Sequence, residues 1–145
     1  MGCGTRRRPD GLIFLAVHLV GERVAEEEVI DAILNNLVTS VNGAQAAIFL
    51  DDDGESISQA GNLKKDMKLL GAWKEIHLDR IKEITGRLGL GTVRAVLFSL
   101  EDGNELAVPV SGEYCLLLFL SAYSSLPDAM AELSKAVELL NQDIS

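Results

Sequence analysis

Tyr114-Cys115-Leu116-Leu117-Leu118-Phe119-Leu120 is a run without any alternation of polar and apolar residues. A short, continuously apolar run is typical of a strand that is buried on both faces. Ser111-Gly112 precedes the run, and the run is too short for a typical helix. We therefore expect a central strand here, with other elements covering both faces of its sheet. Cys115 is expected to pack there as a small apolar side chain.

Two further strands are predicted directly upstream of this run. Thr92–Leu100 is predicted as a strand, and Glu105–Val110 as a returning strand that places Leu106, Val108 and Val110 on one face. Glu101-Asp102-Gly103-Asn104 between them has the composition of a hairpin turn. Pro109 cannot donate a backbone hydrogen bond, so we expect it at a bulge or near the end of its strand. Together with the apolar run, these strands predict an antiparallel meander.

An earlier hairpin is predicted from Ala44–Leu50 and the polar strand Glu55–Ala60, which is expected at a sheet edge. Asp51-Asp52-Asp53-Gly54 connects them, and glycine accepts the positive φ of such a turn. A calcium loop would need ligands at alternate positions and a distant bidentate glutamate, which this segment does not have. We therefore expect a turn and no metal site.

Helices are predicted at Val24–Val41, at Leu63–Leu88 and from Ser124-Ser125-Leu126-Pro127-Asp128 onwards. The resulting order is helix-β-β-helix-β-β-β-helix. This order predicts an α+β sandwich, in which an antiparallel sheet has helices on both faces.

The predicted middle helix carries more apolar residues than one covered face requires. One stripe is expected to cover the sheet: Leu63, Met67, Leu70, Ile81, Ile84 and Leu88. Leu69, Trp73 and Ile76 widen it sideways, which indicates contact with another subunit or a partner. The alternative is that Trp73 packs under a loop of its own domain. If the interface interpretation holds, Trp73→Asp should give a monomer without unfolding the chain.

The composition limits the possible functions. The chain has 145 residues, 48% hydrophobic content and a formal net charge of −9. These values predict a single folded domain that repels nucleic acids and anionic membranes. The charge fits a basic or neutral protein partner, or solubility alone. Two cysteines are too few for a disulfide framework, so we expect a reducing cytoplasm.

The amino-terminal segment leaves three interpretations open. Arg6-Arg7-Arg8 precedes the apolar run Leu12–Val20, but no cleavage site follows, and the run is shorter than the ~20 residues of a membrane span. Met1-Gly2-Cys3 resembles a myristoylation start, although Arg6 stands where Ser or Thr is required. The segment is an extra edge strand or helix, a membrane-proximal tail, or the result of a start codon placed too far upstream.

The sequence contains no recognisable catalytic or cofactor motif. It has no P-loop, no Gly-x-Ser-x-Gly elbow and no cysteine or histidine cluster at metal spacing. The glycines between Gly86 and Gly91 follow a helix and precede a strand, the reverse of a dinucleotide site. His77 and Asp79 lie two residues apart on a helix and do not face each other. We therefore expect no enzyme activity and no cofactor.

The order of the elements resembles the roadblock (dynein light chain) family. The resemblance rests on a helix, Asn42-Gly43-Ala44, a strand ending at Asp51-Asp52-Asp53-Gly54, a long middle helix, a meander and a final helix. It covers about Val24 to Ile144, so we expect a roadblock-like domain at 24–145 after an extension at 1–23. The resemblance implies a profilin-like, five-stranded antiparallel sheet of order 2-1-5-4-3.

The resemblance also implies a function. Family members form homodimers, and bacterial members include regulators of Ras-like small GTPases such as the gliding-motility GTPase. In this chain the edge formed by Thr92–Leu100 and Leu63–Leu88 would pair with its copy. The implied dimer or partner interface comprises Leu69, Trp73, Ile76, His77, Arg80, Val93 and Arg94. We expect a dimeric adaptor without its own active site; the alternatives are a small-molecule sensory domain, or a light-chain or scaffold subunit of a larger complex.

Overall fold

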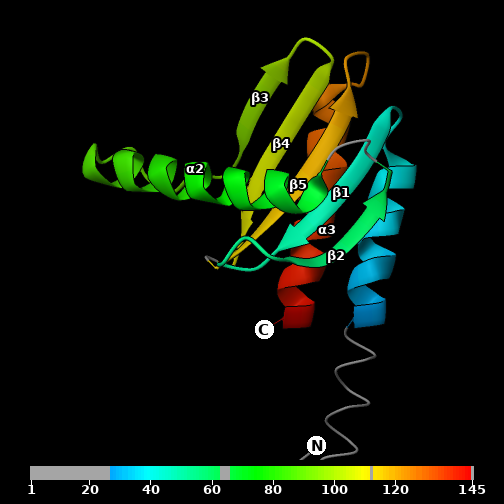
Figure 1. Ribbon diagram of the computed structural model, residues 1–145, viewed down its shortest axis with the longest axis horizontal. Helices are drawn as coiled ribbons and strands as arrows, with labels where there is room; N and C mark the ends of the chain where they lie inside the picture. Colours follow the sequence, from blue (N-terminus) through cyan, green and yellow to red (C-terminus); the bar gives the residue numbers. More distant parts are fainter. Residues whose placement is uncertain (1–26, 63–65, 112, 145) are drawn as a thin grey trace, which may run out of the picture.

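The computed structural model describes residues 27–62, 66–111 and 113–144 (Figure 1). The apolar segment Leu12–Val20 and the extension expected at 1–23 lie outside these ranges. Strand β5 (Tyr114–Ser121) is central and pairs antiparallel with β1 (Ala44–Leu50) and β4 (Gly103–Val110). Its six interior residues are all buried, which confirms the predicted central strand.

The five strands form one antiparallel sheet of order β2-β1-β5-β4-β3, as expected. Strand β2 (Ser56–Gly61) pairs with β1 at one edge, and β3 (Val96–Leu100) pairs with β4 at the other. Gly43 has a φ of 89° and links the first helix to β1, where its carbonyl accepts a hydrogen bond from the Ser121 N–H.

Helices cover both faces of the sheet, so the molecule has three layers (Figure 1). A helix over residues 27–40 and α3 (Leu126–Ile144) lie on one face, and α2 (Met67–Arg87) crosses the other. The two-helix side holds the larger core, with Leu34, Phe49 and Leu133 at its centre. On the α2 side, Leu78 packs over Ile48, Leu117 and other side chains of β1 and β5. Within the described ranges, no helix has both the length and the apolarity needed to cross a membrane.

The third strand is shorter than the predicted strand Thr92–Leu100. It begins at Val96 rather than Thr92, and its pairing with β4 starts at Val96 opposite Ala107. Residues 92–95 belong to no helix or strand. Pro109 is the second-last residue of β4 and lies beyond the part that pairs with β3, so the expected position near a strand end is confirmed.

The prediction that one stripe of apolar residues on α2 covers the sheet was partly wrong. Ile84 and Leu88 are 53% and 66% exposed, whereas Leu78, which was not in the stripe, is 2% exposed. The reason is visible in Figure 1: the carboxyl-terminal half of α2 runs past the sheet edge, where no strand lies beneath it. Ile84 and Leu88, which follow the buried Leu78, therefore have no strand of their own domain beneath them.

Candidate functional site

The carboxyl-terminal part of α2 and the turn after it expose large apolar side chains, although Leu78 within this part is buried against the sheet. We call residues 76–90 the α2 arm. Ile76, Ile84 and Leu88 occur on it at intervals of four or eight residues, which places them on one side of the helix. They are 64%, 53% and 66% exposed. Leu90, in the turn after the helix, is 70% exposed.

The free edge of β3 lies on the same side of the molecule as the α2 arm (Figure 1). Among the described strands, β3 has only β4 as a neighbour, so it lies at the edge of the sheet. Leu97 and Leu100 are 45% and 52% exposed on this strand. An exposed, apolar edge strand is a template for pairing with another chain. We call these features together the arm–edge surface: Ile76, Ile84, Leu88, Leu90, Leu97 and Leu100.

The residues predicted for the interface are only partly brought together. Ile76 and Arg80 are both exposed, four residues apart on the α2 arm, and Arg94 is exposed in the segment before β3. His77 is half-buried, and Val93 is half-buried against the α2-side core. The side chains of Leu69 and Trp73 lie outside the described residues, so their predicted role stays a prediction.

Most of the arm–edge surface was missed by the sequence reasoning. Ile84 and Leu88 had been assigned to the sheet face, because their spacing alone does not show where the sheet ends. Leu97 and Leu100 lie on the strand that the family resemblance places at the pairing edge, but they are not among the interface residues predicted by name. The predicted strand order already puts this strand at an edge, and comparing the length of α2 with the width of the sheet could have identified the exposed residues beside it.

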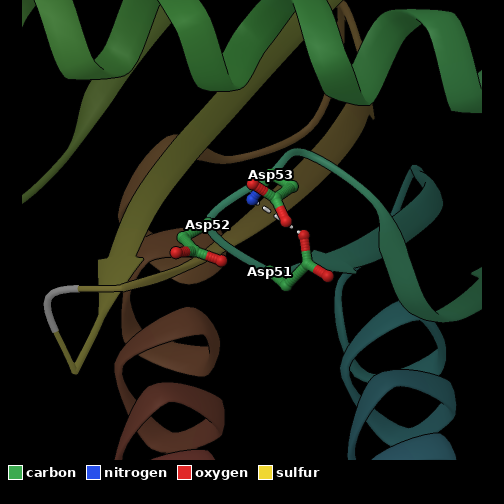
Figure 2. A group of neighbouring side chains, drawn as sticks. All are labelled: Asp51, Asp52 and Asp53. Carbon is green, nitrogen blue, oxygen red and sulfur yellow. Dashed lines mark hydrogen bonds between the residues drawn. The ribbon is translucent and has the colours of Figure 1, made fainter.

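The acidic turn after β1 is stabilised from within the turn (Figure 2). Oδ1 of Asp51 accepts hydrogen bonds from the Asp53 N–H at 2.9 Å and the Glu55 N–H at 3.0 Å. One oxygen from each of Asp51, Asp52 and Asp53 lies within 4.8 Å of the others. The geometry of Asp51 is that of an Asx turn, in which a side chain substitutes for a backbone acceptor. This supports the hairpin turn expected here.

A buried serine joins two elements without creating a catalytic arrangement. Ser58 on β2 is 6% exposed, and its hydroxyl donates to the carboxylate of Asp31 on the first helix. This contact fixes the edge strand to the helix that covers it. Nucleophilic catalysis would instead require a base that accepts the hydroxyl proton and is oriented by a third group. The pair therefore explains packing rather than chemistry.

Comparison with known proteins identifies solved structures of similar fold. No protein-family profile matches the sequence, and no curated protein matches it by sequence. Solved structures do match. Myxococcus xanthus MglB superposes with a TM-score of 0.73 at 18% identity, covering 78% of this chain and 92% of that one.

A Roadblock/LC7 domain from Streptomyces avermitilis gives a TM-score of 0.73 at 19% identity, over 79% of this chain and 96% of that one. A further MglB structure, described as having a tetrameric arrangement, gives 0.74 at 15% identity, over 82% and 90% of the two chains. At these identities the similarity establishes architecture. The chain therefore has the roadblock/LC7 family fold.

Proposed function

We propose that this chain is a cytoplasmic homodimer that acts as a non-enzymatic adaptor for a Ras-like small GTPase. The observation that carries the proposal is the arm–edge surface, whose six large apolar side chains are all at least 45% exposed. Exposed apolar side chains do not contribute to the solubility of this chain, whose net charge is −9. Its presence is accounted for if another polypeptide covers it.

The geometry of the arm–edge surface allows a second copy of the chain to cover it. Two antiparallel copies of one strand are related by a two-fold axis, so β3 pairing with itself would form a closed, isologous contact. The same axis would bring the two α2 arms together across the extended sheet. Burying about 100 Å² of apolar side chain contributes roughly 2.5 kcal/mol, so several such residues offset the entropic cost of association. The related MglB structure in a tetrameric arrangement supports self-association of this fold.

The choice of a small GTPase as the partner rests on the family resemblance and on the structural similarity to MglB. An adaptor needs no nucleophile, base or metal of its own, in agreement with the absence of catalytic motifs from the sequence. Whether binding activates the GTPase depends on which side chains of the dimer contact the nucleotide-binding region of the GTPase. The proposal concerns binding, and modulation of GTP hydrolysis would be a consequence.

A binding experiment with a GTPase in two nucleotide states tests this proposal. The Ras-like GTPase encoded nearest to this gene is immobilised with GDP or with a non-hydrolysable GTP analogue, and the full chain is passed over it. We expect saturable binding that is stronger in one nucleotide state. Binding in neither state, by a chain that light scattering shows to be dimeric, would contradict the adaptor role and leave the dimer intact.

A further inference from the structure

A cavity of about 1000 Å³ opens beside α3, toward the β3 edge of the sheet. We call it the edge notch. Its walls come from α3, from the α2 arm, from residues 91–94 and from the end of β4. The volume lies at the upper end of the range for ligand pockets, ~300–1,000 Å³. The notch is therefore large enough to hold several side chains.

The notch lies on the flank of α3 that faces away from the first helix. The first helix lies over the β2 edge, where the Ser58 hydroxyl donates to the Asp31 carboxylate. Helix α3 is held to the end of β4, because the Ser111 hydroxyl donates to Asn141 Oδ1 at 2.7 Å. Since β3 lies beyond β4 in the sheet, the β3-facing flank of α3 has no other helix of the described residues beside it on this face (Figure 1).

The wall that α3 contributes is mostly apolar. Leu133 is 1% exposed and belongs to the core, whereas Met130 is 36% exposed on the notch side of the same helix. Val137, four residues after Leu133, is half-buried. No carboxylate is among the lining residues, although the chain as a whole carries a net charge of −9. An uncharged, apolar segment would therefore enter the notch without burying an unpaired carboxylate.

The chain itself contains a segment of this chemistry. Leu12–Val20 is nine residues long, and His18 is its one polar side chain. The position of this segment lies outside the described residues. Contact with apolar surface stabilises such a run, by roughly 1.5–3 kcal/mol for each large side chain that is fully buried. Met130 and Val137 offer apolar surface of this kind.

The segment is close enough along the chain to reach the notch of its own copy. The Gly43 carbonyl, just after the first helix, accepts a hydrogen bond from the Ser121 N–H at the end of β5. The described part of the first helix therefore begins at the opposite end of the sheet, where α3 ends (Figure 1). The chain from residue 27 back to Val20 spans up to ~24 Å when extended. Packed helices lie ~8–10 Å apart, so about 20 Å suffices to pass the end of α3 and reach its far flank.

We infer that the edge notch is the docking site of the chain's own apolar segment Leu12–Val20. The segment would pack along the open flank of α3 and complete the two-helix face toward the β3 edge. This inference goes beyond the proposed function and does not depend on it, because none of the six residues of the arm–edge surface lines the notch.

A spin label on the full chain locates the segment directly. Gly11→Cys in a Cys3→Ser background places one accessible thiol immediately before the apolar run, since Cys115 is buried. A nitroxide attached there broadens the amide NMR signals of residues near it. We expect the signals of residues 91–94 and 130–137 to lose at least half of their intensity relative to the reduced label. Signals of β2, at the opposite edge of the sheet, should lose much less.

Substitutions on either side of the proposed contact test it with the same label. Val17→Asp puts a charge into the apolar run, and Met130→Asp puts one on the partly exposed wall of the notch. Each should reduce the loss of intensity at residues 91–94 at least threefold. Leu139→Asp is the matched control, because Leu139 is 46% exposed on α3 and does not line the notch. It should leave the loss of intensity unchanged, and the spread of the amide signals shows that each variant is folded.

Four results would overturn the inference. The first is equal loss of intensity along β2 and around the notch, and the second is a loss centred on the arm–edge surface. The third is a loss that persists in both Val17→Asp and Met130→Asp. The fourth is a loss at the notch of an isotope-labelled chain without a spin label when it is mixed with the spin-labelled chain, because the segment would then dock on another copy. None of these outcomes bears on dimerisation or GTPase binding, which are measured separately by light scattering and by immobilised GTPase.

Discussion

Gly43 shows how a single residue connects two layers of this fold. It lies between the first helix and β1 with a φ of 89°, a left-handed conformation that side chains disfavour. A Cβ atom built there would collide with the hydroxyl oxygens of Ser124 and Ser121, which approach each other to 3.1 Å. The position is therefore restricted to glycine by both conformation and space. It fixes where the first helix ends and the sheet begins.

Gly43→Ala should lower the free energy of unfolding by about 1–3 kcal/mol, because it combines backbone strain with a steric conflict. The matched control is Gly86→Ala on the α2 arm, where an added Cβ meets nothing within 4 Å. That substitution should stabilise the chain by up to about 1 kcal/mol through helix propensity. Urea unfolding followed by circular dichroism measures both, and equal effects would contradict the role assigned to Gly43.

At the scale of elements, Leu78 and Gly71 are the described residues of α2 that lie against the sheet. Leu78 is its one fully described, nearly buried large side chain, and Gly71 allows close approach, since a Cβ there would lie 2.8 Å from Leu50 Cδ2. Among the described residues, the helices on the other face belong to the larger apolar cluster. We predict that α2 detaches from the sheet before α3 does.

Leu78→Ala should lower the free energy of unfolding by about 2–5 kcal/mol, the range for removing a buried leucine side chain. It should also make local opening of α2 easier. In hydrogen exchange, amides of α2 should lose protection at lower denaturant concentration than those of α3, since local opening follows the number of buried apolar contacts. A uniform loss of protection across both helices would show that α2 is not a separately opening unit.

The positions of the strands could be predicted from the sequence, whereas the side of α2 that contacts the sheet could not. The continuous apolar run at β5 identified the centre of the sheet, and glycine-containing turns identified both hairpins. The side of α2 that meets the sheet could not be predicted, because Ile84 and Leu88 have core-like spacing and only the width of the sheet shows that nothing lies beneath them. The late start of β3 was not predicted either, because the composition of residues 92–95 does not show that they lack a pairing strand among the described residues.

At the scale of the whole molecule, the arm–edge surface combines an apolar helical arm with the outer edge of β3, which pairs with β4 alone among the described strands. Both features suit a second copy of the chain, because two copies of one edge strand can pair around a two-fold axis.

Light scattering coupled to size exclusion tests the central claim, which is that the arm–edge surface is covered by a second copy. The wild-type chain should elute with twice the 15.6 kDa chain mass, and Ile76→Asp combined with Ile84→Asp should give a folded chain of 15.6 kDa. Leu139→Asp, at an apolar position of α3 that is 46% exposed, should leave the dimer mass unchanged. A monomeric wild type, or a dimer that survives the double substitution, would contradict this account.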